Sequence, residues 1–95
     1  MAQWALVTGA TVGIGESFTR LLASKGYNIA LVARDEVRLH ERAGELREKY
    51  GIQTFVLPAD LATKGGVKLV EKYIQSYEIE VLINNAGFAI SKTFT

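Results

Sequence analysis

Short apolar segments alternate with segments of helical periodicity along the chain, and this alternation constrains the fold more than any other feature. The apolar segments are residues 4–8, 28–33, 53–57 and 81–83, with Pro58 expected to end the third. Their length suits strands, and the first two are apolar on both faces, as parallel strands covered on both sides are. Because strands and helices that alternate in this way form right-handed crossovers, we predict an α/β fold. It is a partial Rossmann-type, doubly wound parallel sheet with strand order 3-2-1-4.

The segments between the strands carry apolar side chains at helical spacing. The first helix is predicted over residues 13–25, with Gly26 as its C-terminal cap. Asp35 is the predicted N-cap of the second helix, and Thr63 is that of the third. The pair Gly65-Gly66 weakens the expected first turn of the third helix. The apolar stripes are Ile14, Phe18, Leu21 and Leu22, then Leu39, Ala43, Leu46 and Tyr50, then Val67, Val70, Ile74 and Tyr77.

A glycine-rich turn follows the first strand. Gly9, Gly13 and Gly15 stand where a chain leaving a strand turns tightly, brings its backbone near a ligand, and packs the start of a helix on the sheet. The free N–H groups and positive dipole end of that helix favour an anion such as a pyrophosphate. Glycine also serves any tight turn, so this stretch alone leaves both interpretations open. In the predicted strand order, residues 84–87 meet the turn at the switch point of the sheet, where ligands bind.

Composition excludes several classes of partner. The chain has 95 residues with 11 Lys and Arg against 10 Asp and Glu, so it has no basic field to attract nucleic acid or anionic lipid. It has no cysteine, and His40 is its single histidine, so we expect no metal site and interpret His40 as a surface side chain. No apolar run approaches the ~18 residues that span a bilayer. We therefore expect a cytoplasmic protein with neither membrane nor nucleic acid as partner.

Two motifs together resemble the short-chain dehydrogenase/reductase family. They are Thr8-Gly9-x-x-x-Gly13-x-Gly15 after the first strand and Asn84-Asn85-Ala86-Gly87 after the fourth. The three residues between the first two glycines match the spacing of that family, and not the G-x-G-x-x-G of the general dinucleotide fingerprint. The resemblance covers the whole chain. It implies an oxidoreductase that transfers hydride between a nicotinamide dinucleotide and a small carbonyl or alcohol substrate.

The resemblance also implies which residues hold the cofactor. Thr8 would tie the turn to the fourth strand through Asn84. Asp60 would accept a hydrogen bond from the adenine amino group, with Leu61 as the adjacent wall, although Asp60 also suits a loop carboxylate that caps the next helix. The implied cofactor-binding residues are Gly9, Thr11, Gly13, Ile14, Gly15, Arg34, Asp60, Leu61, Asn85, Ala86 and Gly87.

Arg34 bears on the choice between NADP(H) and NAD(H). It follows Gly15 by nineteen residues, where an acid would bind a ribose 2′-hydroxyl or an arginine a 2′-phosphate. Guanidinium binds phosphate through two parallel hydrogen bonds. In the family, the acid that selects NAD usually occupies the position of Ala33, so the prediction is NADP(H). Asp35 leaves NAD(H) open, because it could take the role of that acid if the second strand ran further.

No catalytic residue is predicted within the chain. The chemistry of the family uses a tyrosine as general acid/base, a lysine four residues later and a serine that orients the substrate. None of Tyr27, Tyr50, Tyr73 and Tyr77 is followed by lysine at that spacing. The resemblance therefore implies that residues 1–95 are the NADP(H)-binding half-domain of a parent enzyme, truncated before its catalytic elements, and that the parent is a homo-oligomer.

An alternative interpretation is a half-domain without catalytic activity, which binds nucleotide or associates with itself. The fourth strand, residues 81–83, has no predicted partner on its outer edge. An exposed apolar edge invites pairing with another chain. We therefore expect the isolated chain to self-associate or to be poorly soluble.

Overall fold

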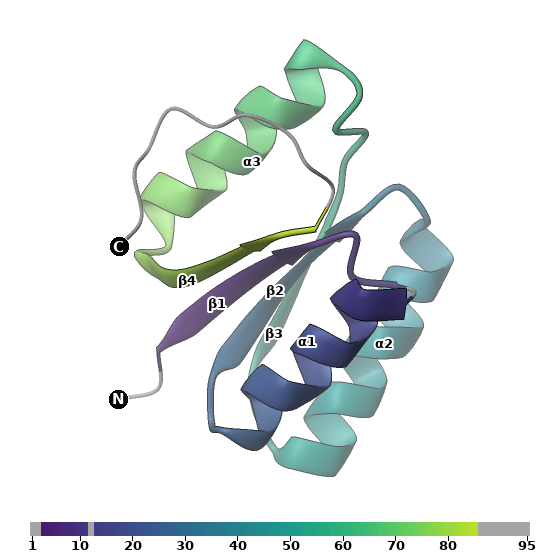
Figure 1. Ribbon diagram of the computed structural model, residues 1–95, viewed down its shortest axis with the longest axis vertical. Helices are drawn as coiled ribbons and strands as arrows, with labels where there is room; N and C mark the ends of the chain where they lie inside the picture. The colour runs from purple at the N-terminus through teal and green to yellow at the C-terminus, as the bar shows by residue number, and fades with distance from the viewer. Residues whose placement is uncertain (1–2, 12, 86–95) are drawn as a thin grey trace.

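The computed structural model describes residues 3–11 and 13–85. Strands and helices alternate through this part of the chain (Figure 1), as β1 (Trp4–Thr8), α1 (Gly13–Ser24), β2 (Asn28–Ala33), α2 (Glu36–Tyr50), β3 (Thr54–Pro58), α3 (Lys64–Ser76) and β4 (Ile79–Asn84). All paired strands run parallel, in the order β3-β2-β1-β4. The predicted fold class and strand order are therefore confirmed.

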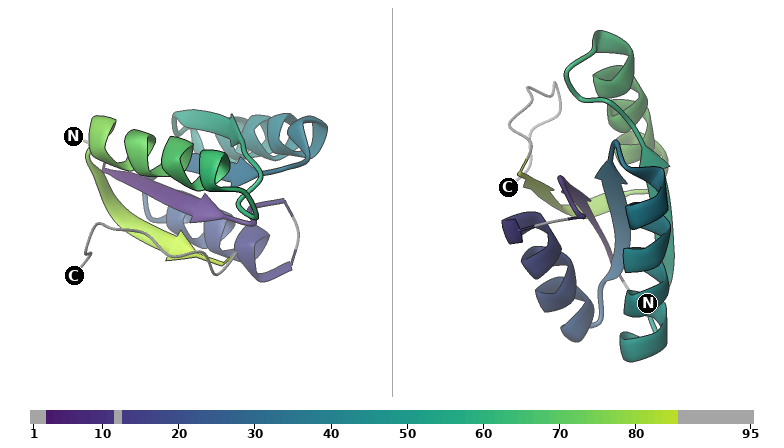
Figure 2. Two further views of the ribbon diagram at one scale, coloured as in Figure 1. Left: turned by 90° about the horizontal axis from the view of Figure 1, so that it is seen from above. Right: turned by 90° about the vertical axis from the view of Figure 1, so that its right-hand side faces the viewer.

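The sheet is covered on both faces. Helices α1 and α2 lie on one face and α3 lies on the other (Figures 1 and 2). Alternate residues of β1 pack against the helices on opposite faces of the sheet, because side chains alternate across a strand. Ala5 and Val7 pack in the α1 and α2 layer, and Leu6 packs in the α3 layer, all at 0% exposure. The all-apolar central strands thus arise from two cores that share one sheet.

The predicted helix caps are confirmed. The side chain of Asp35 accepts a hydrogen bond from the backbone N–H of Arg38, and that of Thr63 accepts one from Gly66. Each bond satisfies one of the donors that a helix leaves unpaired in its first turn. These caps fix where α2 and α3 begin, and so fix the loops that precede them at the carboxyl ends of β2 and β3.

The bounds of β3 and β4 differ from the prediction. Strand β3 runs from Thr54 to Pro58, so Pro58 is its last residue, opposite Ala33, and not the residue that follows it. The strand tolerates proline because it lies at the edge of the sheet, and the following residue, Ala59, donates its N–H to the Ala33 carbonyl at 3.0 Å. Strand β4 begins at Ile79, before the predicted position, and its register shifts between Trp4 and Ala5 of β1. Because the shift interrupts regular pairing there, the sequence pattern does not predict where β4 begins.

The described residues were searched for helices that could span a membrane and for side chains that could bind a metal ion. In residues 3–11 and 13–85, none of the helices combines the length and apolar character needed to cross a bilayer. Within the same ranges, no group of His, Cys, Asp and Glu could hold a metal ion. His40 is exposed on α2, as predicted.

Candidate functional site

The turn between β1 and α1 uses its glycines for different physical reasons. Gly9 and Gly13 have φ angles of 63° and 59°, a region that side chains other than glycine rarely adopt. Gly15 lies beneath the turn, where an added Cβ would overlap the backbone carbonyl of Gly9. The glycines therefore bend the chain and let helix α1 pack against the turn.

The end of β4 lies against this turn, as the two sequence motifs predicted. The Thr8 hydroxyl, fully buried, lies within hydrogen-bond distance of Asn84 Oδ1 at 3.3 Å and of the Ile83 carbonyl at 3.4 Å. Next to it, Nδ2 of Asn85 lies 2.8 Å from the position that a Cβ on Gly9 would occupy. The predicted link between Thr8 and Asn84 is confirmed. Ala86 and Gly87, which were also predicted to contact the cofactor, lie outside the described residues.

A cavity of about 430 Å³ opens at the carboxyl ends of β1, β2 and β3. Five predicted residues line it, namely Gly9, Thr11, Arg34, Asp60 and Leu61. Asp35, which the sequence left open as an acid for NAD(H), also lines it, together with Ala33, Ala59 and Ala62, which were not predicted to bind. The alanines give no signal of their own in the sequence, because their small size becomes useful only where three strand ends meet.

The other predicted residues of the turn do not line this cavity. Gly13 and Ile14 border a separate open hollow of about 590 Å³ along α1, and Ile14 is 67% exposed. Gly15 is buried under the turn and contacts it from below. The turn therefore separates two accessible surfaces, with Gly9 and Thr11 on one side and Gly13 and Ile14 on the other.

The side chain of Asp60 accepts one local hydrogen bond. Oδ1 accepts from the Ala62 backbone N–H at 2.9 Å, and the Asp60 carbonyl accepts from both the backbone N–H and the hydroxyl of Thr63. The N-cap of α3 is Thr63 and not Asp60. The half-buried carboxylate thus stabilises its own loop and still lines the cavity.

Gly66 fixes the position of the Asp60 loop. A Cβ on Gly66 would overlap the Asp60 carbonyl, whereas a Cβ on Gly65 would meet nothing within 4 Å. The sequence predicted only that both glycines weaken α3. The contact between Gly66 and Asp60 could not be predicted from propensity, because it depends on how the loop folds back over the helix.

The two residues after β2 are Arg34, an exposed base, and Asp35, an acid that is bound by Arg38. Strand β2 ends at Ala33, and Asp35 is held by Arg38, whose backbone N–H lies 3.1 Å from Oδ1 and whose Nε lies 3.5 Å from Oδ2. Arg34 is exposed beside the cavity and forms no ion pair or side-chain hydrogen bond with another described residue. A cation is therefore available here, while the neighbouring carboxylate has a partner.

Sequence reasoning missed Arg42. It belongs to a run of charges that the pattern assigns to the solvated face of α2, yet its Nε donates to the Thr11 carbonyl at 3.3 Å. Nothing in the local sequence signals this contact, because the two residues meet only when α1 and α2 pack side by side.

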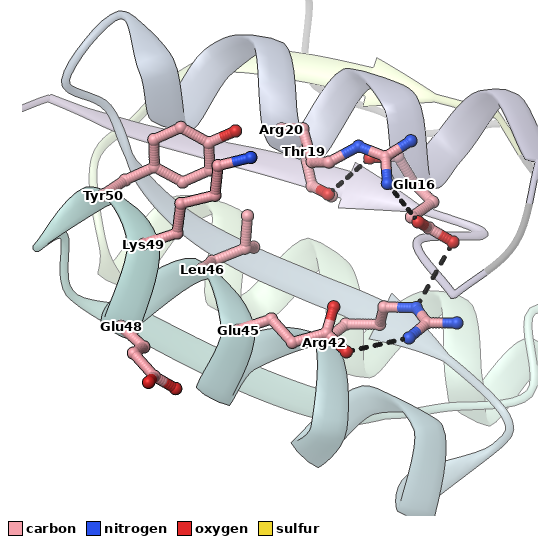
Figure 3. A pocket seen from close by; sticks show the side chains of 9 residues that line it. All are labelled: Glu16, Thr19, Arg20, Arg42, Glu45, Leu46, Glu48, Lys49 and Tyr50. Carbon is pink, nitrogen blue, oxygen red and sulfur yellow. Dashed lines mark hydrogen bonds and ion pairs between the residues drawn. The ribbon is translucent and has the colours of Figure 1, made fainter.

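Another cavity, of about 470 Å³, lies between α1 and α2 (Figure 3). Its charged lining residues are Glu16, Glu45 and Glu48 together with Arg20, Arg42 and Lys49. Acids and bases balance, so this groove offers no net field to a charged ligand. The cavity at the strand ends remains the better candidate, because it lies where open α/β sheets bind ligands.

Comparison with known proteins points to one family. The family described as short chain dehydrogenase matches residues 3–95. The chain is 38% identical over 92 residues to a very-long-chain 3-oxoacyl-CoA reductase of Anas platyrhynchos, covering 96% of the chain and 30% of that relative. The curated relatives are longer, and the chain spans less than a third of this one.

Solved structures agree with the family match. A short-chain dehydrogenase from Sphingobium yanoikuyae in complex with NADPH superposes with a TM-score of 0.85 at 40% identity, over 97% of this chain and 36% of that one. An L-sorbose reductase from Gluconobacter frateurii, complexed with NADPH and L-sorbose, has a TM-score of 0.84 at 37% identity, over 97% and 36% of the two chains.

Proposed function

Since the chain belongs to the short-chain dehydrogenase family, we propose that it binds NADP(H) and that the protein transfers hydride between this cofactor and a carbonyl or alcohol group. The observation that carries the proposal is the cavity at the carboxyl edge of the sheet, where the glycine turn meets Arg34 and Asp60. Ligands of open α/β sheets bind at this edge. When bound, the nicotinamide ring of such a cofactor donates or accepts the hydride.

The glycine turn suits the pyrophosphate of the cofactor. The space beside Gly13 is open, since no other described part of the chain would lie within 4 Å of an added Cβ. The N-terminus of α1 directs unpaired backbone N–H groups and a positive dipole toward an anion. In this proposal the turn binds the pyrophosphate with its backbone, and Asn85 supports the turn from the end of β4.

The loop after β3 suits the adenine. Asp60 and Leu61 both line the cavity, one with a carboxylate and the other with an apolar side chain. Only Oδ1 of Asp60 has a hydrogen bond among those described, so Oδ2 is available to accept one from an exocyclic amine. We assign the adenine amino group to Asp60 and one face of the ring to Leu61.

The environment of Arg34 supports NADP(H) over NAD(H). The Arg34 guanidinium is exposed at the cavity, where it could bind a 2′-phosphate through two hydrogen bonds. Asp35, the acid that could instead receive a ribose hydroxyl, holds the first turn of α2 and pairs with Arg38. The NADPH complexes of the Sphingobium yanoikuyae and Gluconobacter frateurii enzymes support the same choice.

The substrate proposed is a carbonyl compound or the corresponding alcohol. The names of the related very-long-chain 3-oxoacyl-CoA reductase and L-sorbose reductase both describe reduction of a carbonyl. No residue of the present chain is assigned to the chemical step. The proposal for the chain itself is cofactor binding, and the reaction is proposed for the whole protein, as a homo-oligomer.

Titration calorimetry with NADPH and NADH tests the proposal. We expect saturable binding of both cofactors at one site per chain, with NADPH the tighter. AMP, which carries adenine without the pyrophosphate or the 2′-phosphate, should bind more weakly than either. A chain that is folded by circular dichroism and binds neither cofactor would refute the proposal. Tighter binding of NADH would refute only the assignment of Arg34.

A further inference from the structure

The side chain of Arg42 contacts the glycine turn, whereas that of Arg38, on the same helix, pairs with Asp35. The Arg42 side chain is 25% exposed and that of Arg38 is 53% exposed. Nε of Arg42 lies 3.3 Å from the Thr11 carbonyl. The same atom lies 3.3 Å from Oε2 of Glu16, and Nη1 lies 3.2 Å from Oε1 of Glu45 (Figure 3 shows these three side chains). One arginine of α2 therefore contacts both the glycine turn and the first turn of α1.

Glu16 explains why a positive charge is useful here. It lies in the first turn of α1, the end of the helix proposed to face a pyrophosphate, and its side chain is only 19% exposed. A carboxylate in this position opposes an incoming anion, because like charges repel more strongly where solvent screens them less. Arg20 pairs with one carboxylate oxygen at 2.7 Å, and Arg42 pairs with the other. Two guanidinium groups thus contact this acid, and one of them, that of Arg42, is shared with Glu45.

The contact with Thr11 concerns the shape of the turn. Nε of Arg42 binds the Thr11 carbonyl from the side of α2. A carbonyl that has a donor on this side is held in one orientation, so Arg42 restricts the conformations open to Thr11 in the turn. The way in which a turn presents its backbone N–H groups to an anion depends on its conformation.

We propose that Arg42 is a positioning residue for the cofactor pyrophosphate, holding the Thr11 carbonyl toward α2 while it offsets the charge of Glu16. This inference rests on the proposed binding of NADP(H). It assigns to Arg42 a role separate from that of Arg34, since the pyrophosphate is common to NADPH and NADH and the 2′-phosphate is not. Loss of Arg42 should weaken both cofactors equally, whereas loss of Arg34 should weaken NADPH selectively.

The test compares cofactor affinities of wild type, Arg42→Gln, Glu16→Gln and the double variant in the full chain. Arg47→Gln is the matched control, because Arg47 lies on the same helix and donates to Thr54 at 2.6 Å, away from the turn. Calorimetry gives the dissociation constants for NADPH and NADH at low and high salt. Urea unfolding of each variant records any loss of stability separately.

We expect Arg42→Gln to weaken both cofactors about fivefold with an unchanged NADPH to NADH ratio, the lower range of coupling between linked sites. Adding Glu16→Gln should restore part of that loss, and the restored part should shrink at high salt. Arg47→Gln should bind both cofactors like wild type. If Arg42→Gln fails to fold, Arg42→Lys, which keeps a charge beside Glu16, should fold and bind both cofactors more weakly than wild type at the same ratio.

The outcomes separate this proposal from the proposed function. If wild type binds both cofactors and Arg42→Gln binds them equally well, the role of Arg42 is refuted and the proposed function stands. A selective loss of NADPH in Arg42→Gln would also refute it, because it would place Arg42 at the 2′-phosphate. If folded wild type binds neither cofactor, both proposals fail together.

Discussion

At the scale of single residues, the glycine turn is the feature on which the proposed function depends most. Gly15 tolerates no side chain, because a Cβ there would overlap the Gly9 carbonyl. In helix α2, by contrast, a Cβ on Gly44 would lie at an ordinary contact distance of 3.7 Å from Nη2 of Arg47. Gly15 is therefore a helical glycine that is needed for close packing, and Gly44 is one that is not.

We predict that Gly15→Ala lowers the free energy of unfolding by about 2 kcal/mol, the usual cost of forcing extra volume into a packed site. It should also abolish measurable NADPH binding, because the turn must shift. Gly44→Ala should instead raise the free energy of unfolding by roughly 0.5–1 kcal/mol through its better helix propensity. Urea denaturation and calorimetry measure both effects. Gly15→Ala with stability and affinity of wild type would contradict this account of the turn.

A second prediction concerns Arg34, the exposed base that lines the cavity. Arg34→Ala should weaken NADPH roughly 10- to 100-fold, the worth of a hydrogen bond between charged groups, and leave NADH nearly unchanged. Arg38→Ala is the control, since Arg38 is committed to Asp35. Dissociation constants for both cofactors decide the matter. An equal loss for NADPH and NADH would place the Arg34 side chain elsewhere than at the 2′-phosphate.

Residue roles could be predicted from the sequence where a local motif carries them. The caps at Asp35 and Thr63 belong to this class, because their chemistry shows in residue type and position. The pairing of Thr8 with Asn84, which lie far apart in the sequence, was implied only by the resemblance to the family. The contact of Arg42 with the turn depends on helix packing, so no pattern predicts it.

At the scale of elements, the start of α3 positions the Asp60 loop. The sequence predicted each strand and helix that the described residues form, because the two-sided burial of the strands and the apolar stripes of the helices are local signals. The bounds of the elements differ from the prediction where strand pairing decides them. Pro58 joins β3 because that strand lies at the edge, and the register shift opposite Trp4 and Ala5 moves the start of β4.

The two glycines of α3 provide a matched pair of tests. Gly66→Ala should lower the free energy of unfolding by roughly 1–3 kcal/mol, because the added Cβ would overlap the Asp60 carbonyl. It should also weaken NADPH by displacing Asp60. Gly65→Ala meets no neighbour and should stabilise the protein by roughly 0.5–1 kcal/mol. Thermal and urea unfolding measure the difference, and equal effects of the two substitutions would show that the contact with Asp60 is unimportant.

At the scale of the whole molecule, β4 is an edge strand through which two copies of the chain could associate. Among the described strands it pairs with β1 alone, and Val81, Leu82 and Ile83 are only half-buried. We predict that the 95-residue chain self-associates through this strand, because an apolar strand edge is a template for further pairing. Sedimentation velocity over a range of concentrations should show oligomers that grow with concentration. A monodisperse monomer that unfolds cooperatively would contradict this prediction.

In the proposed function, the carboxyl edge of the sheet holds the cofactor. The most direct measurement is the change in backbone amide NMR shifts as NADPH is added to the isotopically labelled protein. We predict the largest changes at Gly9, Thr11, Arg34, Asp60 and Leu61, which line one cavity, and little change at Gly51 and Gly26, at the opposite end of the sheet. Changes concentrated in the groove between α1 and α2, near Leu46 and Tyr50, with none around the cavity, would contradict the claim.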